Sequence, residues 1–498
     1  MTIPTEADGS LVTVPFEAVP PVQAPASSGR RVVRALAASG GAKIVVMPIA
    51  AIANLVIARM VTGAVGIEMF GAVMLIATLS QSLNFADLGV GAPVATASSN
   101  LDGTAAATER FRRILLTAVR TMLVSATALG LVAVGLAVFG LWAPLLGIPE
   151  VPGGLSAGAA TALALLAFSA SLPFFVGEAL LRGGGRTHEA VLLTGLSAPV
   201  ALLLTLLLHA VDAPAYSYAL ALPLGLLAVA LGCGFRGWRF LRDSVRGVLS
   251  QVLRPRRFPG LPVAAMAVPW FVIMVGLPIA LQSDRIIIAQ RAPDVELSHY
   301  TYAAQLYLPM WSVIAVAALA LWPVFAKADQ GSGGKRRSWL TGTAVLTTVA
   351  VVFAAGLLLL GGLVIGWMSG GEAHPSLQLL AAFALLLLVQ AAHVTSGIML
   401  ISPAQLRFQA VCVVALVATN VPLSWWLTPH LGAAGPVLVS AVTVFVCQLV
   451  PCAVLAWRET SRPRSAPKPP GHPDHGPTAA RQPTGPIRPH TRDARRTK

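Results

Sequence analysis

The sequence predicts an all-α polytopic membrane protein, and three observations support that fold class. Of the 498 residues, 56% are hydrophobic and 11% are charged, with a mean hydropathy of +0.75, whereas about a quarter are charged in an average soluble domain. The apolar residues form runs of at least about 18, the length that a helix needs to cross a bilayer core of about 30 Å. These runs are apolar on every face, whereas the strands of membrane barrels are about 10 residues long and alternate in polarity.

We expect about twelve transmembrane helices in two six-helix lobes. The expected spans are 41–62, 69–92, 114–140, 156–180, 188–210, 214–235, 262–289, 298–325, 339–367, 377–401, 405–428 and 432–457. The basic connector 236–261 is the longest, so it divides the spans into an N-lobe (41–235) and a C-lobe (262–457). Residues 1–40 are expected to be a flexible cytoplasmic segment. Residues 458–498, rich in Pro and Arg, are expected to be a disordered cytoplasmic tail.

The basic residues of the connectors predict the orientation, since short loops that carry Lys and Arg stay in the cytoplasm. The even-numbered connectors contain 17 basic residues, whereas the odd-numbered ones and their edges contain Arg59 and Arg291. Both termini are therefore expected on the cytoplasmic side of the cytoplasmic membrane. Residues 1–29 contain acids and prolines but no apolar core, so no cleavable signal peptide is expected and the first span serves as an anchor.

The charge and cysteine patterns exclude several other classes. The net charge of +15 comes from connectors and the tail, so the expected partner is anionic membrane lipid rather than nucleic acid. The four cysteines lie in apolar runs without metal-site or disulfide-framework spacing. The sequence has no Walker loop, GxSxG or HExxH motif. We expect no metal, no cofactor and no enzymatic chemistry.

Prolines interrupt corresponding spans of the two halves. Pro48 lies in the first span, and Pro269 and Pro278 lie in the seventh. Proline removes a backbone hydrogen bond and bends a helix. In transporters, matched interruptions often lie next to a central cavity, although simple packing kinks would explain them equally well.

Among the ionisable residues in or at the ends of the expected spans, five are chosen as candidates, because each needs a cavity, a partner or an interface. Arg59 ends the first span, where it could instead reach the interface. Asp87 ends the second span and could pair with the basic connector. Arg120 lies about two turns inside the third span, within reach of the headgroups. Asp284 and Arg285 are adjacent in the seventh span and point about 100° apart, which requires a wide cavity or a local break.

Uncharged polar side chains in the spans suggest a second set of candidates. Interhelical hydrogen bonding is their usual role, and ligand contact is the alternative. The residues chosen as candidate ligand contacts are Asn54, Asn84 and Gln282. Tyr300, Tyr302 and Tyr307 have the spacing and place of an interfacial aromatic belt.

Two stretches resemble polysaccharide-exporting flippases of the O-antigen type. The first contains Ala58-Arg59-Met60, then Glu68-Met69-Phe70-Gly71 and Phe85-Ala86-Asp87-Leu88-Gly89. The second contains Ser283-Asp284-Arg285-Ile286-Ile287-Ile288, followed by Tyr300 and Pro323. The resemblance covers roughly residues 40–95 and 265–330. The chain departs from it at Val61-Thr62-Gly63, where the family usually has Leu-Gly-Pro.

This resemblance implies the multidrug, oligosaccharidyl-lipid and polysaccharide exporter fold, with two lobes in a V around a central cavity and bent first and seventh spans. The implied activity is movement of an undecaprenyl-pyrophosphate-linked oligosaccharide between leaflets. Arg59, Arg120 and Arg285 would then bind the pyrophosphate, with Asn54, Asn84 and Gln282 contacting the sugars. Asp87 and Asp284 would bind a coupling proton or sodium ion, or hold those arginines.

Three alternatives remain at this stage. An ion-coupled drug or metabolite antiporter of the same superfamily would favour a cavity of acids and aromatics, against which the arginines argue. A sugar facilitator would carry a Gly-x-x-x-Asp-Arg-x-Gly-Arg signature, which the second connector lacks. An integral-membrane glycan polymerase or glycosyltransferase would carry a large outer loop, whereas the outer loops here are about a dozen residues or fewer.

Overall fold

A computed structural model describes most of the chain. The described residues are 29–79, 83, 90–99, 101, 103–151, 154–245, 247–258, 267–319, 321, 325, 332–400 and 402–461. Within these ranges every regular element is a helix and there is no strand, which confirms the all-α fold class. The expected tail lies almost entirely outside the described residues.

The first half of the chain forms one helical bundle. Its elements are α1 (Gly29–Leu79), α2 (Gly91–Ser99), α3 (Ala105–Val138), α4 (Trp142–Leu146), α5 (Ala157–Gly183), α6 (Thr187–Gly195), α7 (Ser197–Ala210), the 3₁₀ helix η2 (Ala215–Leu220), α8 (Ala221–Phe240), α9 (Arg242–Val245) and α10 (Val248–Val252). Helix α5 packs between α3 and α8. Glycines allow close approach there, since a Cβ added to Gly237 would lie 2.8 Å from Gly177 Cα. We call this group the first bundle.

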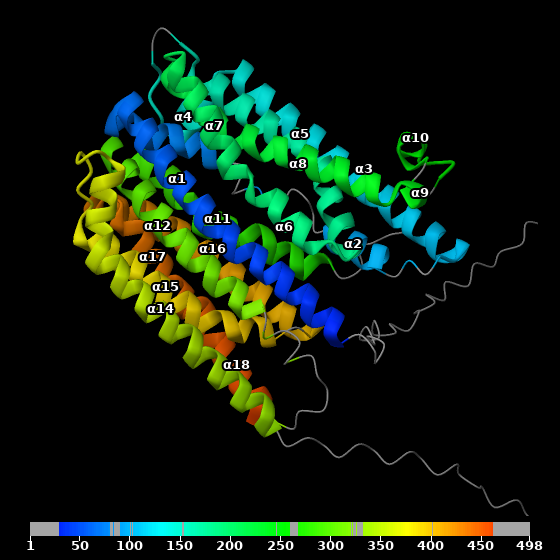
Figure 1. The fold of residues 1–498 in the computed structure, drawn as a ribbon. Helices are drawn as coiled ribbons and strands as arrows, with labels where there is room; N and C mark the ends of the chain where they lie inside the picture. Colours follow the sequence, from blue (N-terminus) through cyan, green and yellow to red (C-terminus); the bar gives the residue numbers. More distant parts are fainter. Residues whose placement is uncertain are drawn as a thin grey trace, which may run out of the picture.

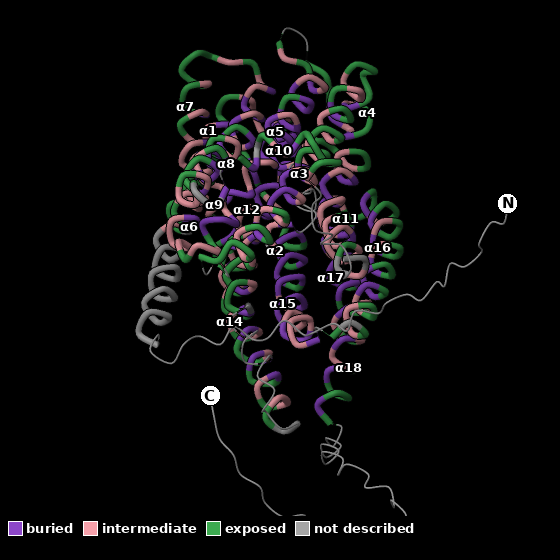
Figure 2. The backbone as a smooth tube through the Cα atoms, turned by 90° about the vertical axis from the view of Figure 1, so that its right-hand side faces the viewer, coloured by how far each residue is buried: buried purple, intermediate pink, exposed green. Residues whose placement is uncertain are grey.

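The second half forms the other group, which we call the second bundle. Its elements are α11 (Ala267–Arg291), α12 (Asp294–Leu319), α14 (Ser332–Met368), α15 (Leu377–Met399), α16 (Pro403–Leu431), α17 (Ala434–Val444), the π-helical turn η3 (Phe445–Leu449) and α18 (Val450–Ser461). Helix α15 packs against α12, α14 and α17, and Figure 2 shows it buried along much of its length. Helix α11 packs against α16.

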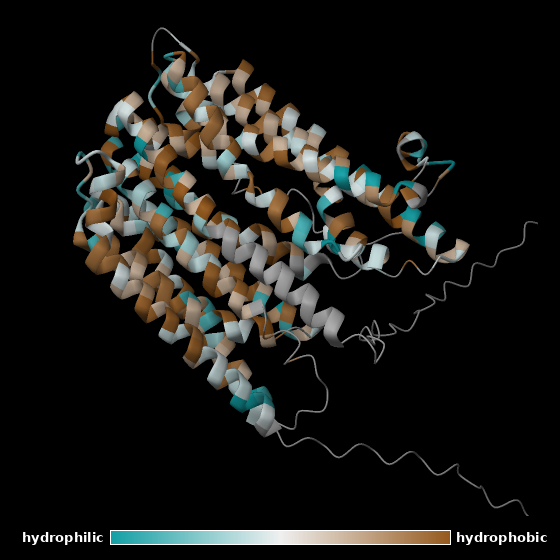
Figure 3. Ribbon diagram, viewed as in Figure 1, coloured by the Kyte–Doolittle hydropathy of each residue, from teal (hydrophilic) through white to brown (hydrophobic). Residues whose placement is uncertain are grey.

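The helix surfaces have the polarity expected in lipid. Large apolar side chains such as Val138, Leu359 and Leu363 are among the most exposed. Figure 3 shows hydrophobic colouring along most of the helices, with hydrophilic residues gathered near ends such as those around α2, α3 and α9. Ten helices in the described ranges are long and apolar enough to span a membrane. The chain is therefore a multi-pass membrane protein.

The ten spanning helices differ from the expected twelve in two places. The first two expected spans join in α1, where Gly66 (φ 80°, ψ 166°) is non-helical and separates two helical segments. The expected span 298–325 corresponds to α12, a 26-residue helix that is not among the ten. Helix α1 passes through Pro48 and α11 passes through Pro278 as continuous helices. The break in α1 thus falls in the predicted connector and not at Pro48.

Helices occupy part of two segments that were expected to lie outside the two lobes. Helix α1 begins at Gly29, inside the segment 1–40 that was expected to be flexible. The predicted linker 236–261 starts with the last turn of α8 and continues as α9 and α10. Val248 and Val252 of α10 are buried against α3, in a cluster with Phe111 and Leu115. The linker is therefore packed on the first bundle as far as the structure describes it.

The two bundles contact each other mainly through α1 and α12, at the end where α4 lies. Phe70 stacks on Tyr302 with ring centroids 4.3 Å apart, and the Gly71 N–H donates to Ser298 Oγ at 2.8 Å. A Cβ on Gly71 would lie 2.7 Å from Ser298 N, so only glycine allows this approach. Figure 1 shows the bundles side by side at this end and diverging towards α9 and α18. We call the α4 end the closed end.

Candidate functional site

A cavity of about 490 Å³ lies between the two bundles. Its walls come from α1, α8, α11 and α12. The residues that line it are Ala50, Ala51, Asn54, Leu55, Ile57, Met74, Thr78, Leu222, Arg285, Thr301, Gln305, Leu306, Leu308, Pro309, Met310 and Ser312. We call it the central cavity. Among its described lining residues, Arg285 is the one with a charge.

Arg285 is held by α11 with its side chain facing α1. The residue is 6% exposed, and its Nη1 donates to Thr78 Oγ1 of α1, so it joins the two bundles. Its guanidinium carbon lies 5.9 Å from the ring centre of Tyr300. Its Nε has no hydrogen-bond partner, and no ion pair to it is found among the described residues. A cation at membrane depth costs at least about 2.5 kcal/mol on insertion scales, so an anionic ligand would stabilise it.

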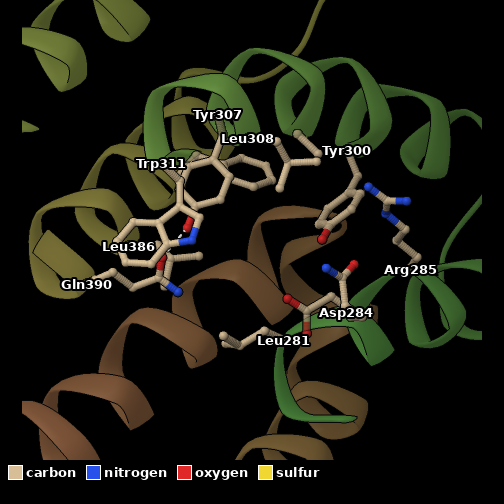
Figure 4. A pocket seen from close by; sticks show the side chains of 12 residues that line it. Leu281, Asp284, Arg285, Tyr300, Tyr307, Leu308, Trp311, Leu386 and Gln390 are labelled. Carbon is tan, nitrogen blue, oxygen red and sulfur yellow. Dashed lines mark hydrogen bonds between the residues drawn. The ribbon is translucent and has the colours of Figure 1, made fainter. Parts of the chain in front are cut away.

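A second, smaller cavity of about 90 Å³ adjoins Arg285 within the second bundle. It is lined by Leu281, Gln282, Asp284, Arg285, Tyr300, Ala304, Tyr307, Leu308, Trp311, Phe383, Leu386 and Gln390. Figure 4 shows Asp284, Arg285 and Tyr300 at one end of it and Trp311, Leu386 and Gln390 at the other. We call it the side cavity. Arg285 lines both cavities, so this residue is shared by the two.

Asp284 belongs to a buried polar network of α11, α16 and α17. The residue is 2% exposed, and its Oδ2 accepts a hydrogen bond from Ser440 Oγ at 3.2 Å. Asn420 Nδ2 donates to Ser440 Oγ at 2.9 Å and to Thr443 Oγ1 at 3.1 Å. Asp284 Oδ1 has no partner within the described parts of the chain. A buried carboxylate oxygen without a donor is costly, so this atom is a candidate contact for a cation or a hydroxyl.

The structure brings together four of the eight predicted site residues. Asn54 and Arg285 line the central cavity, and Gln282, Asp284 and Arg285 line the side cavity. Asn84 and Asp87 lie outside the described residues. Arg59 and Arg120 are described, and neither lines these two cavities.

Arg59 and Arg120 have structural contacts instead. Arg59 donates to the carbonyl of Trp367 at the end of α14, and its guanidinium carbon lies 5.4 Å from that indole. It therefore ties α1 to the second bundle. Arg120 donates to the carbonyls of Gln251, Val252 and Phe258, at 2.8, 2.8 and 2.9 Å respectively. This geometry holds the linker on α3, because three donors of one guanidinium cap carbonyls that α10 and the next turn leave open.

The tyrosines of α12 lie inside the protein, so the interfacial belt interpretation is wrong for them. Tyr302 is fully buried on Phe70 and bonds to Thr62. Tyr300 and Tyr307 line the side cavity, where Tyr307 donates to Gln390 Oε1. Their seven-residue spacing placed them on one helix face. That spacing was visible in the sequence, but which face was inward was not.

Thr78 was missed as a cavity residue, and Gln305 is an uncharged polar residue of the spans that was not chosen as a site residue. Both line the central cavity beside Arg285, and Gln305 Oε1 is buried without a partner among the described residues. Gln305 is recognisable in the sequence as a glutamine within an apolar run. Thr78 carries no such signal, since threonine is common in membrane helices and often bonds its own backbone, as it does here to Met74 at 2.7 Å.

Solved structures share this arrangement of helices. A multidrug-resistance MATE family transporter of the MOP superfamily, in an inward-facing conformation, matches with a TM-score of 0.62 and 14% identity over 83% of this chain and 94% of its own. The lipid II flippase MurJ, in an inward closed conformation, matches with a TM-score of 0.56 and 14% identity over 84% of this chain and 88% of its own. A MOP superfamily transporter from Pyrococcus furiosus, described as having a binding pocket of reverse polarity, matches with a TM-score of 0.57 and 14% identity over 86% of this chain and 96% of its own.

The chain therefore has the fold of MOP-superfamily transporters. These structural neighbours include both drug exporters and a lipid flippase, so the fold by itself leaves the substrate open. No protein-family model matches the chain. No curated protein matches it by sequence.

Proposed function

We propose that this protein is a flippase of the cytoplasmic membrane that carries a lipid-linked oligosaccharide precursor across the bilayer. The observation that supports the proposal most directly is Arg285. It is a buried cation with no acidic ion-pair partner among the described residues, on the wall of a cavity between two bundles. A cavity whose charge is positive suits an anionic headgroup.

Phosphate is the anion that this guanidinium would bind best. Arginine presents donors in a planar fork, and its bonds to phosphate oxygens are charge-assisted and short. Arg285 Nε is a donor without a partner among the described residues, and Nη1 now donates to the neutral Thr78 hydroxyl, which a phosphate oxygen could displace. Asn54 and Gln305 would supply neutral hydrogen bonds around the charged centre.

The contacts at the closed end suit alternating access. Arg59, Tyr302 and Ser298 all join residues of α1 to the second bundle, and rocking the bundles would exchange these contacts for others at the opposite end. The basic connectors next to α3 and α8 lie at the diverging end. We therefore propose that the diverging end and both termini face the cytoplasm, with the basic surface against anionic lipid.

Asp284 is proposed as the site of the coupling proton or sodium ion. Its carboxylate is buried and accepts from Ser440 on Oδ2, while Oδ1 has no partner among the described residues, and the same Ser440 hydroxyl accepts from Asn420. Oxygen ligands of this kind suit a hard cation, and a proton would serve equally well to neutralise the group. Asp87 keeps its proposed coupling role from the sequence.

One feature favours a second candidate, an ion-coupled drug or metabolite antiporter. The side cavity combines the Asp284 carboxylate with the rings of Tyr300, Tyr307 and Trp311, and aromatic faces attract organic cations. Arg285 on the same wall opposes cation binding through charge repulsion. That opposition is why we rank the flippase first.

Transport by the purified protein in vesicles distinguishes the two candidates. One set of vesicles receives a fluorescent pyrophosphate-linked oligosaccharide lipid, whose arrival in the outer leaflet is read by quenching with a membrane-impermeant reductant. A second set is tested for uptake of an aromatic cationic dye. The flippase proposal predicts transfer of the glycolipid well above protein-free vesicles and no dye uptake. Dye uptake without glycolipid transfer would establish the antiporter instead.

A further inference from the structure

The lining of the side cavity combines aromatic rings with polar groups. Phe383 lies between Tyr300 and Tyr307, with ring centroids 5.4 and 5.2 Å away. Trp311 adds its indole at the end of the cavity away from Tyr300, as Figure 4 shows. Rings packed against each other in this way are rigid, so they form a fixed surface on which a ligand can stack.

The polar part of the lining comes from Gln282, Asp284, Arg285 and Gln390. Asp284 and Arg285 are only 2% and 6% exposed, so bulk water has little access to them. Gln390 accepts from Tyr307 and Asp284 accepts from Ser440. Buried polar side chains are costly unless they are hydrogen-bonded, so the cavity suits contents that offer donors and acceptors together.

Two adjacent residues of opposite charge, Asp284 and Arg285, line the cavity. A hydroxyl group can donate to a carboxylate and accept from a guanidinium group. A neutral polyol can therefore bond to both residues without adding a charge to the site.

The volume of the cavity limits the size of the ligand. One water needs a cavity volume of roughly 10–15 Å³, so the side cavity, at about 90 Å³, has room for about six to nine waters. A single sugar ring is of this size, whereas a disaccharide is not. The apolar C–H face of a pyranose would lie on an aromatic ring of the lining, while its hydroxyls bond to the polar side chains.

We propose that the side cavity binds one neutral hexopyranose unit of the cargo while the phosphate linked to it lies in the central cavity. Arg285 lines both cavities, so one side chain contacts the phosphate and the sugar bonded to it. This inference rests on the proposed flippase function. It adds a subsite that reads the first sugar, formed by the second bundle alone.

Binding measurements with small soluble probes test the subsite. The purified full-length protein in nanodiscs is titrated with a panel of hexose 1-phosphates, with inorganic phosphate and with tetramethylammonium. We expect at least one hexose 1-phosphate to bind about tenfold more tightly than inorganic phosphate. Trp311→Leu and Gln282→Ala should each remove most of that advantage while leaving phosphate affinity within about twofold.

A matched control separates the subsite from a general effect of losing an indole. Trp426 lies on α16 facing outward, 64% exposed, so Trp426→Leu should retain the full advantage. Phosphate binding with no gain from any hexose would overturn the subsite and leave the flippase proposal standing. Failure of all phosphates to bind would overturn both. Tetramethylammonium binding that Trp311→Leu abolishes would show a cation site and overturn the sugar assignment.

Discussion

Arg120→Met tests whether the linker is fastened to the first bundle by one guanidinium. The variant keeps the aliphatic length of the side chain but removes the donors to the carbonyls of Gln251, Val252 and Phe258. Water can reach part of this site because Arg120 is only partly buried. Each bond then contributes about 1 kcal/mol net, so the linker should lose about 3 kcal/mol of local stability.

Amide hydrogen exchange measures this loss directly. A change of about 3 kcal/mol corresponds to roughly a hundredfold faster exchange through local opening. We expect that acceleration in peptides covering residues 248–258, with little change in α5 or α15. Arg113→Met is the matched control, because Arg113 lies two turns earlier on α3 and bonds only an exposed Glu109 at 3.0 Å, a pair worth about 0.3–0.5 kcal/mol. Unchanged protection of the linker in Arg120→Met would refute the reasoning.

Three further predictions concern the bundle contacts and the polar network. Gly71→Ala adds a methyl group against the Leu297–Ser298 backbone, which should lower the free energy of unfolding by about 1–3 kcal/mol. The variant should also increase the labelling of a cysteine placed at Ser298. Equal labelling with and without the substitution would contradict the close approach. Tyr302→Phe keeps the stack on Phe70 and removes the hydrogen bond to Thr62. Because one such bond is worth about 1 kcal/mol, we expect the melting temperature to fall by only a few degrees. Asp284→Asn should make glycolipid transfer independent of the driving ion gradient; transfer that still follows the gradient would exclude Asp284 as the coupling site.

The sequence was sufficient to predict the fold class and to identify the charged residues Asp284 and Arg285. Apolar run length predicted the helices because lipid imposes one length on all of them. Asp284 and Arg285 were recognisable because an ionisable residue inside a span is costly unless it has a partner or faces a cavity. The join of the first two spans at Gly66 was harder to predict, since glycine permits both a loop and a sharp break.

The sequence could not distinguish arginines that face a cavity from arginines that bond to backbone. Arg120 and Arg285 both interrupt apolar spans, yet one caps carbonyls of the linker and the other lines two cavities. This difference in role depends on hydrogen-bond partners that are distant in the sequence. The partners of Arg120 are more than 130 residues away, and the partner of Arg285 is about 200 residues away. The rotation of α12, which turns Tyr300 inward, depends in the same way on packing against other helices.

Transfer of a pyrophosphate-linked glycolipid in reconstituted vesicles by Arg285→Ala, Arg285→Lys and Arg291→Ala tests the central claim most directly. Arg291 lies on the same helix, exposed, with its guanidinium carbon 5.0 Å from the Trp425 ring, so its variant controls for loss of an arginine. We predict that Arg285→Ala abolishes transfer, that Arg285→Lys retains a small part of it and that Arg291→Ala matches the wild type. Wild-type transfer by a folded Arg285→Ala protein would contradict the claim that this cation carries the phosphate through the bilayer.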